Sequence, residues 1–305
     1  MHGEILEPLA KEDEAKVLKD NLGIDVKKLD HYLDLFKQWI TSQQHLVQDY
    51  NDDCLRKFLL WSKLDFDKAK KKFVMFCYNT LIHEELVSNR VITLERDLKC
   101  TEYAYLFPLS KLTPQGYRLT VHKIIDPDQL DLLELFRYVN LLLDYTIHKD
   151  GIRIGEILLY DMEHFKPQHY HKLFNIQLLK FLRCTERNFP FKIKSAYVIN
   201  CHPLLEKGIS LCKGVLNQKI AKRIILTTPQ ELPKHLALQY LPKDYGGDEN
   251  SMDEFRDLWR KELQANEEFL IEISKRRPTG SVPEEFKAYE TEFGIDGSFR
   301  KLNID

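Results

Sequence analysis

The sequence predicts an α/β protein in which an all-helical N-terminal part precedes a mixed, mostly parallel sheet flanked by helices. Through about residue 95, apolar residues recur only at the helical spacing. From about Cys100 onward, short β-branched and aromatic runs alternate with helical segments, which is typical of parallel strands joined by helices. The chain has 305 residues, of which 43% are hydrophobic and 30% are charged, so it has enough apolar material for a sizeable core.

The N-terminal helices are predicted from apolar spacing and capping residues. The first clear helix covers 27–40. Its apolar stripe consists of Leu29, Leu33, Phe36 and Ile40. Asn51 or Asp52 is suited to cap the next helix, because a side-chain oxygen at that position accepts from free backbone N–H groups. A further helix begins at 65–69 and continues to Leu81.

Periodicity divides the remaining chain into strands and helices. Strands are predicted at 105–109, 117–122, 155–160, 193–199 and 223–227. Helices are predicted at 130–147, 167–184, 203–216 and 252–275. Turn residues between Thr113 and Gly116 separate the first two strands. We therefore divide the chain into an N-terminal helical domain (1–95), a sheet domain (96–250), and a C-terminal helix with an extended tail (251–305).

The sequence contains no motif for catalysis, cofactor binding or metal coordination. Glycine-rich phosphate loops, a hydrolase nucleophile elbow and His-Glu-x-x-His are all absent. Glu156 and Asp161 could act as an acid–base pair, but we interpret them as the solvent-near start and the end of a strand. His122 and His148 stand alone and are interpreted as ordinary packed or surface histidines. We expect no catalytic residue, no cofactor and no metal site, and thus no enzyme.

Charge and cysteine usage favour a cytoplasmic protein without a nucleic-acid partner. The formal net charge is -2, so any anion binding must come from a local patch. The six cysteines form no Cys-x-x-Cys pair and follow no secretory signal, which indicates reduced thiols. The sequence contains no run of 18 apolar residues, which a membrane-spanning helix would need.

Two pairs of basic residues flank an apolar strand and helix. Lys192 and Lys194 share a strand face by the two-residue period. Lys219 and Arg223 are four residues apart and would share a helix face. If the two pairs converge, they form a four-cation cluster that can hold a multiply charged phosphate. The alternative is a solvated charged rim.

The predicted helix at 203–216 has many apolar residues and few charges. These apolar residues are Leu204, Leu205, Ile209, Leu211, Cys212, Val215 and Leu216. A core helix is the ordinary interpretation of such a segment, and a mobile lid is the alternative. Gly208 and Gly214 each weaken the helix by about 1 kcal/mol relative to alanine, which is compatible with a lid without requiring one.

Four blocks of this sequence, in order over about residues 50–260, resemble the CRAL-TRIO family of lipid-binding proteins. They lie at 52–69, 155–165, 188–203 and 241–247. The second is a strand followed by Asp161, and the third is a strand leading into an apolar helix. The ending at 297–302, Gly-Ser-Phe-Arg-Lys-Leu, resembles the tails of insect members.

The resemblance implies a CRAL-TRIO-N helical subdomain followed by a CRAL-TRIO lipid-binding domain with a gate helix at Leu204–Leu216. It implies a cytosolic, monomeric carrier that meets membranes peripherally and reversibly. By the same matching, a phosphoinositide headgroup would bind a basic cleft formed by Lys192, Lys194, Lys219 and Arg223. The cargo would be a small hydrophobic lipid such as a retinoid, carotenoid or tocopherol.

Matching to the family also gives candidates for the pocket wall, each of which could equally be ordinary core. They are Phe136, Val139, Leu143, Leu158, Tyr160, Leu173, Phe181, Cys184 and Ala196. Val139 and Leu143 replace serines that help to hold the tocopherol hydroxyl in the family, which disfavours tocopherol itself and favours a more apolar ligand. Glu156 would lie at the pocket edge or hold a polar ligand end. The competing function is a phosphoinositide or phospholipid interaction module without isoprenoid cargo.

Overall fold

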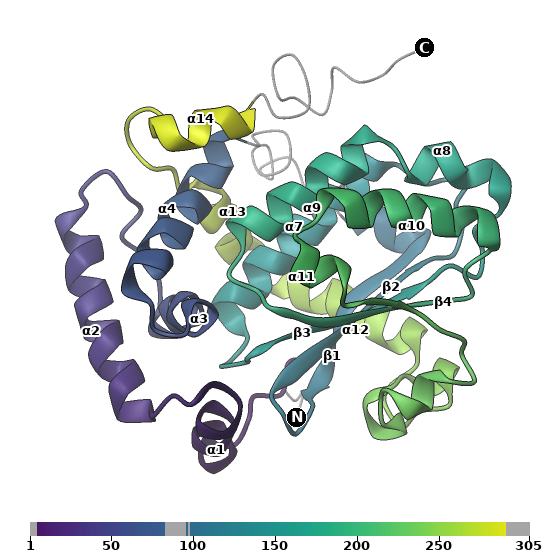
Figure 1. Ribbon diagram of the computed structural model, residues 1–305, viewed down its shortest axis with the longest axis horizontal. Helices are drawn as coiled ribbons and strands as arrows, with labels where there is room; N and C mark the ends of the chain where they lie inside the picture. The colour runs from purple at the N-terminus through teal and green to yellow at the C-terminus, as the bar shows by residue number, and fades with distance from the viewer. Residues whose placement is uncertain (1–4, 83–95, 97, 291–305) are drawn as a thin grey trace.

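The computed structural model describes residues 5–82, 96 and 98–290, and it confirms the α/β fold class (Figure 1). Helices α1 to α4 form a group beside the sheet, and further helices lie over the sheet. Two hydrophobic cores organise the chain: one joins the N-terminal helices, and the other surrounds the sheet. Within the described ranges, no helix has both the length and the apolar content needed to cross a bilayer.

The N-terminal helices form as the spacing predicts. They are α1 (Lys11–Leu22), α2 (Val26–Ser42), α3 (Asp52–Ser62) and α4 (Phe66–Ile82). Asn51 is the N-cap of α3, and its side chain accepts from the backbone N–H of Cys54. At the centre of this core, the Phe73 ring meets the rings of Phe36 and Phe58 edge-on, at centroid distances of 5.5 and 5.2 Å.

A five-stranded sheet follows, in the order β1-β2-β3-β4-β5. The strands are β1 (Ala104–Leu112), β2 (Tyr117–Ile124), β3 (Gly155–Asp161), β4 (Ile193–Ile199) and β5 (Ile224–Leu226). The first pair is antiparallel, and the other three pairs are parallel. Because parallel strands in this order need right-handed crossovers, the connecting helices lie on one face of the sheet. The helix that packs on β1 from the other face is α12, where the Phe107 and Phe255 rings stack at 5.5 Å.

The remaining helices complete both layers. They are α7 (Leu132–Lys149), α8 (Tyr170–Leu173), α9 (Ile176–Asn188), α10 (Pro203–Val215), α11 (Gln218–Ala221), α12 (Met252–Ala265), α13 (Glu267–Lys275) and α14 (Glu284–Glu290). Short 3₁₀ turns occur at Lys99–Glu102, Pro167–His169, Leu232–Lys234, Leu238–Tyr240 and Lys243–Tyr245. The buried Trp259 of α12 donates its indole N–H to the Pro108 carbonyl, 2.9 Å away, and so ties α12 to the edge strand.

Two predicted helices are each broken by an asparagine. The expected helix at 167–184 is interrupted because the Asn175 side chain accepts from the backbone N–H groups of Gln177 and Leu178 and starts α9 anew. The expected helix at 252–275 breaks at Asn266, between α12 and α13. Apolar spacing continues across both breaks, so periodicity alone does not reveal them.

The C-terminal tail is also more ordered than predicted. Residues 284–290 form α14 rather than an extended segment, and its Phe286 is fully buried. Glu285 pairs with Lys71 of α4 at 2.9 Å, so the tail returns to the N-terminal helices. The segment at 297–302 and the proposed boundary near residue 95 lie outside the described residues.

Candidate functional site

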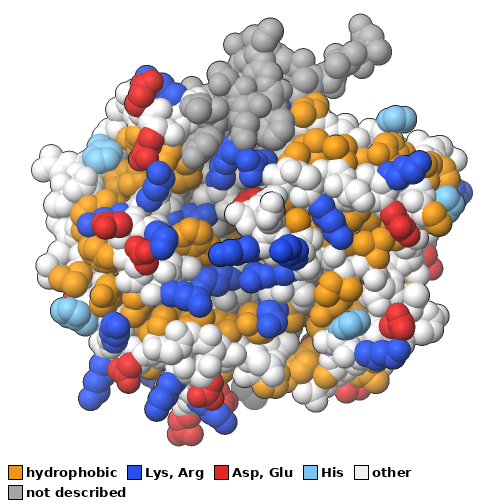
Figure 2. Space-filling view, in the orientation of Figure 1, with side chains coloured by type: hydrophobic (Ala, Val, Ile, Leu, Met, Phe, Trp, Pro, Cys, Tyr) orange, Lys and Arg blue, Asp and Glu red, His pale blue; other side chains and the backbone are white. Residues whose placement is uncertain are grey.

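Basic side chains gather in a band between α3 and α11 (Figure 2). We define the basic patch as Lys63, Lys192, Lys194, Lys219 and Arg223. Within the described part of the chain, none of the five is ion-paired with a carboxylate. Unpaired cations at a surface are free to meet an external anion, which distinguishes this patch from a rim of internal salt bridges.

Lys192 is the most constrained cation of the patch. It lies directly before β4, and its ammonium donates to the Leu60 carbonyl of α3, 2.8 Å away. Burial, together with the positive charges of Lys63 and Arg223, lowers its pKa to about 8. An anion bound here would therefore relieve repulsion among three cations.

The geometry of the patch differs from the predicted one in one respect. Lys219 and Arg223 do not share a helix face, because α11 ends at Ala221 and Arg223 directly precedes β5. Arg223 instead reaches β4, where its guanidinium donates to the Ile193 carbonyl. Lys194 is exposed beside it, with its ammonium 5.5 Å from the centre of the Tyr117 ring. The structure thus brings Lys192, Lys194 and Arg223 together, and it places Lys219 exposed on α11.

One face of the sheet is partly accessible although helices lie over it. Register places Thr120, Leu158 and Ala196 side by side, and His122, Tyr160 and Val198 form the next row of the same face. We call this the α10-side face, because Tyr160 lies near α10: burial raises the pKa of its hydroxyl, and the neighbouring Cys212 thiol of α10 adds to that rise. Thr120, His122, Leu158 and Tyr160 retain partial solvent access.

The opposite face of the same strands is sealed. Val121 and Leu159 alternate with the residues of the α10-side face, and both are 0% exposed. The two faces therefore differ in burial: these residues of one face are inaccessible to solvent, whereas several residues of the α10-side face keep partial access. An apolar, partly accessible wall beneath a helix is the setting in which a small hydrophobic ligand can bind.

α10 has one buried face and one exposed apolar face. Leu205, Ile209 and Cys212 are buried in the core that surrounds the sheet. Val215 packs at the edge of the same core, and Leu216 is the half-buried C-cap. Leu204 is 37% exposed and Leu211 is 46% exposed. Exposed leucines on a helix beside cations are suited to contact with a membrane interface.

A glycine lets α10 approach the segment between α8 and α9. A Cβ atom added at Gly208 would lie 2.2 Å from the Phe174 ring, closer than any real Cβ contact. Gly214, six residues further along, has nothing within 4 Å of its Cβ position. Gly208 is thus required for close packing of α10, whereas Gly214 is not.

The pocket candidates separate into groups. Phe136 of α7 and Phe181 of α9 stack with centroids 4.0 Å apart, and Val139 and Leu173 pack at the margin of the same core. Ala196, Leu158 and Tyr160 lie on the α10-side face. Leu143 packs against the core of the N-terminal helices instead. The Cys184 thiol is directed to Asn79 of α4, with a sulfur–oxygen distance of 3.5 Å.

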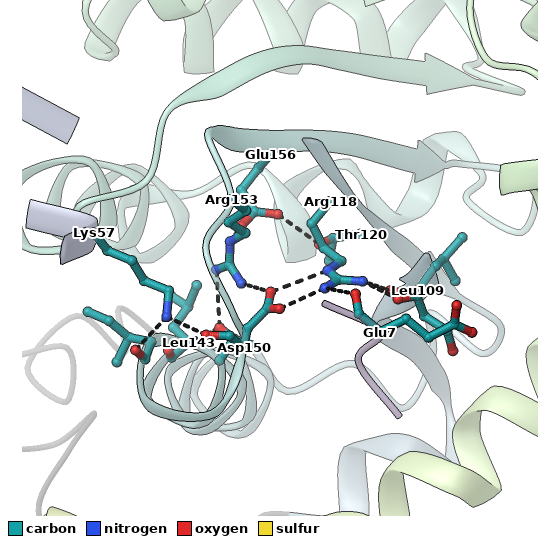
Figure 3. Close-up of polar contacts among 12 residues, drawn as sticks. Glu7, Lys57, Leu109, Arg118, Thr120, Leu143, Asp150, Arg153 and Glu156 are labelled. Atoms are coloured by element: carbon teal, nitrogen blue, oxygen red, sulfur yellow. Dashed lines mark hydrogen bonds and ion pairs between the residues drawn. The ribbon is translucent and has the colours of Figure 1, made fainter. Parts of the chain in front are cut away.

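Glu156 belongs to a buried ion cluster, which corrects its interpretation as a solvent-near residue. We define the cluster as Lys57, Arg118, Asp150, Arg153 and Glu156, all buried (Figure 3). A Glu156 oxygen lies 2.7 Å from Nε of Arg153, and its other oxygen is 3.4 Å from the Thr120 hydroxyl. Burial raises the pKa of Glu156, against the opposing effect of Arg153.

Asp150 is the centre of this cluster. It pairs with Arg118 at 2.6 Å and with Arg153. Burial alone would raise the pKa of Asp150, but the two guanidinium groups outweigh it and lower the pKa to about 2. Lys57 of α3 donates to the carbonyls of Ile147 and Asp150 at 2.9 and 2.6 Å, so the cluster joins the N-terminal helices to α7.

The cluster lies next to the basic patch. Lys57, Arg153 and Lys192 line a small cavity of about 10 Å³ between them, which is enough for one water molecule. β3 and β4 meet closely here, because a Cβ at Gly155 would lie 2.3 Å from the Lys192 carbonyl oxygen. Lys192 of the basic patch therefore lies next to Lys57 and Arg153 of the buried ion cluster.

A second polar group stands at the other end of β3. Asp161 is buried and lies 3.0 Å from the Lys123 ammonium. Asn200, after β4, donates to one Asp161 oxygen at 2.8 Å, and the Tyr245 hydroxyl donates to the other at 2.9 Å. Asp161, Asn200 and Tyr245 come from three of the four sequence blocks that carry the family resemblance, so these blocks converge in space.

Comparison with known families agrees with this convergence. Residues 105–247 match the model of the CRAL/TRIO domain, from β1 to the turn that follows Tyr245. The chain contains a CRAL/TRIO domain. The family therefore supports lipid binding or transfer as the general function, and the fold described above is the CRAL/TRIO fold with a helical N-terminal region.

A solved structure shares the CRAL/TRIO architecture over most of the chain. The crystal structure of Sfh5 superposes with a TM-score of 0.51, covering 80% of this chain and 99% of that chain. The two sequences are only 12% identical, so the likeness is one of fold.

Several residues of the site were not identified from the sequence. Lys63 takes a left-handed conformation at the end of α3, and nothing in its local sequence places it beside β4. Arg118 and Arg153 interrupt apolar runs, which is a signal that could have indicated buried partners. His122 was assigned no role, and its strand register puts it beside Tyr160.

Proposed function

We propose that this CRAL/TRIO protein binds a small hydrophobic lipid beneath α10 and transfers it between membranes. The observation that supports this most is the position of α10. It lies over the partly accessible α10-side face, exposes Leu204 and Leu211 outward, and leads directly into α11 and the basic patch. Phosphoinositide at the basic patch would favour opening of α10 and exchange of the cargo.

The partly accessible residues of the α10-side face, Thr120, His122, Leu158 and Tyr160, would form the wall against which the cargo lies. Because α10 lies over that face, we expect loading and release to move α10 away from the sheet. The proposed protein is a cytoplasmic, monomeric carrier that contacts membranes transiently, and no turnover of the lipid is expected.

Solvent extraction of the purified full chain, followed by mass spectrometry, tests the cargo. We expect close to one apolar lipid of the retinoid, carotenoid or tocopherol class per chain, and none from a preparation denatured and washed before refolding. Recovery of a phospholipid instead would favour the second candidate, a phosphoinositide-recognition module. The basic patch supports that candidate, because its cations can bind an anionic headgroup whether or not a lipid is bound beneath α10.

Membrane binding should depend on pH through Lys192. Its pKa is about 8 in the free protein, so it is mostly charged at pH 7 and mostly neutral at pH 9. A bound anion favours the charged form, and affinity for phosphoinositide vesicles should therefore fall about fivefold as pH rises from 7 to 9. Vesicle co-sedimentation measures this.

The matched control is Lys192→Arg, because arginine stays charged over the whole range. Any decrease in vesicle affinity that Lys192→Arg still shows between pH 7 and 9 comes from other groups. Equal pH dependence of the two proteins would remove Lys192 from the proposed headgroup site.

A further inference from the structure

A pair of polar side chains lies on the α10-side face without a hydrogen-bonding partner among the described residues. His122 of β2 and Tyr160 of β3 are register neighbours, and their rings stack with centroids 4.5 Å apart. Nε2 of His122 is buried and bonds to nothing in the described chain. Neither the imidazole nor the Tyr160 hydroxyl makes any hydrogen bond to a described residue. Buried polar groups are normally paired, so Nε2 of His122 calls for an external partner, and the hydroxyl of the half-buried Tyr160 beside it can bind the same partner.

The position of the pair fits the end of an elongated ligand. Tyr160 is four residues from Glu156 along β3, or about 13 Å at the rise of a strand. Glu156 is already paired with Arg153 at the end of β3 nearest the basic patch. Leu158 and Ala196 lie between the two polar ends on the same face. A lipid along this face would thus place its polar end on His122 and Tyr160, away from the headgroup site.

The chemistry of the pair selects among polar ends. Burial lowers the pKa of His122 to about 4, so the ring is neutral at neutral pH, and no charged side chain contributes to that shift. A carboxylate would therefore find no countercharge. A neutral imidazole offers one donor and one acceptor, and a phenol does both. A hydroxyl group, which donates and accepts at once, can satisfy both side chains in either tautomer of the imidazole, whereas a carbonyl, which only accepts, can bond to Nε2 of His122 in one tautomer alone.

We propose that His122 and Tyr160 bind the terminal hydroxyl group of a lipid alcohol carried beneath α10. This inference rests on the proposed carrier function and names the chemical class of its cargo. It also gives a cargo hydroxyl a partner on the sheet, since Val139 provides no polar side-chain atom on the α7 side.

The test compares two ligands that differ by one hydroxyl group. Binding of all-trans-retinol and of the hydrocarbon that lacks its hydroxyl is measured by fluorescence titration on the full chain. Tyr160→Phe and His122→Phe should each weaken retinol binding about fivefold, which corresponds to one hydrogen bond. Hydrocarbon binding should stay within about twofold, which also shows that the variants fold.

Tyr197→Phe is the matched control, because Tyr197 lies on the opposite face of β4 and stacks with His235. It should leave both affinities unchanged. Equal losses for retinol and the hydrocarbon, or no loss for either, would overturn the hydroxyl site while leaving the carrier function standing. If the wild-type chain binds neither ligand but a phospholipid is recovered from it, the carrier proposal fails as well.

Discussion

Replacing Asp150 with asparagine should lower the free energy of unfolding by about 3–5 kcal/mol, the usual cost of breaking a buried ion pair by removing one partner. The substitution keeps the shape of the side chain but leaves Arg118 and Arg153 without a shared countercharge in a fully buried site. Urea denaturation of the two proteins measures the difference.

Lowering the pH should also decrease the free energy of unfolding, because it protonates Asp150. Because its folded pKa, about 2, is below the ordinary value of about 3.9, the stabilisation is present above pH 4 and is lost as pH falls toward 2. The Asp150→Asn variant should therefore lose less stability than the wild type over that interval.

The control is an exposed ion pair. Glu231→Gln removes a carboxylate that lies 3.1 Å from Lys234 at the surface, and it should change stability by less than about 1 kcal/mol. If Asp150→Asn is as mild as Glu231→Gln, the buried ion cluster does not hold the N-terminal helices to the CRAL/TRIO domain.

Replacing Gly208 with alanine should release cargo about 5 to 150 times faster. The added methyl group would collide with the Phe174 ring at 2.2 Å, and overpacking of this kind costs about 1–3 kcal/mol. The cost falls on the closed position of α10, since the clash disappears when α10 moves away from Phe174. Stopped-flow fluorescence of a bound lipid transferred to excess vesicles reports the rate.

Gly214→Ala is a control on the same helix. Its methyl group meets nothing within 4 Å, and alanine favours the helix by about 1 kcal/mol. This variant should release cargo no faster than the wild type. Similar acceleration in both variants would indicate an effect of helix propensity rather than of the Gly208–Phe174 contact.

The sequence was sufficient for the fold and for part of the site. Strand alternation and helical spacing predict β1 to β5 and most helices, because those periods are local properties of the chain. Asn175 breaks one predicted helix because its side chain caps α9, which competes with apolar spacing at a single residue. At Asn266 the backbone N–H bonds to carbonyls of the last turn of α12 and ends that helix. The local sequence therefore predicts where helices and strands occur better than it predicts the residues at which they end.

Tertiary packing explains the residues that sequence reasoning misplaced. Glu156 looks like the exposed start of a strand, but Arg153, three residues earlier, turns inward and pairs with it. Lys192 and Arg223 approach each other because β4 and β5 are neighbours, not because a helix aligns Arg223 with Lys219. The pairing of His122 with Tyr160 depends on the register between β2 and β3, which one sequence does not reveal.

The central claim is that cations beside α10 couple membrane contact to cargo exchange. It is tested most directly by the rate of lipid transfer to acceptor vesicles with and without phosphatidylinositol bisphosphate, in the wild type and in Lys194→Ala/Lys219→Ala. Both lysines are exposed and unpaired within the described chain, and each is worth about 1 kcal/mol at an anionic surface. The double variant Lys27→Ala/Lys28→Ala on α2 removes the same charge elsewhere.

We predict that the phosphoinositide accelerates transfer by the wild type and by the α2 variant alike. The Lys194→Ala/Lys219→Ala variant should bind these vesicles about 30-fold more weakly and lose most of the acceleration. Equal acceleration in all three proteins would contradict the account, since it would show that the basic patch does not control exchange.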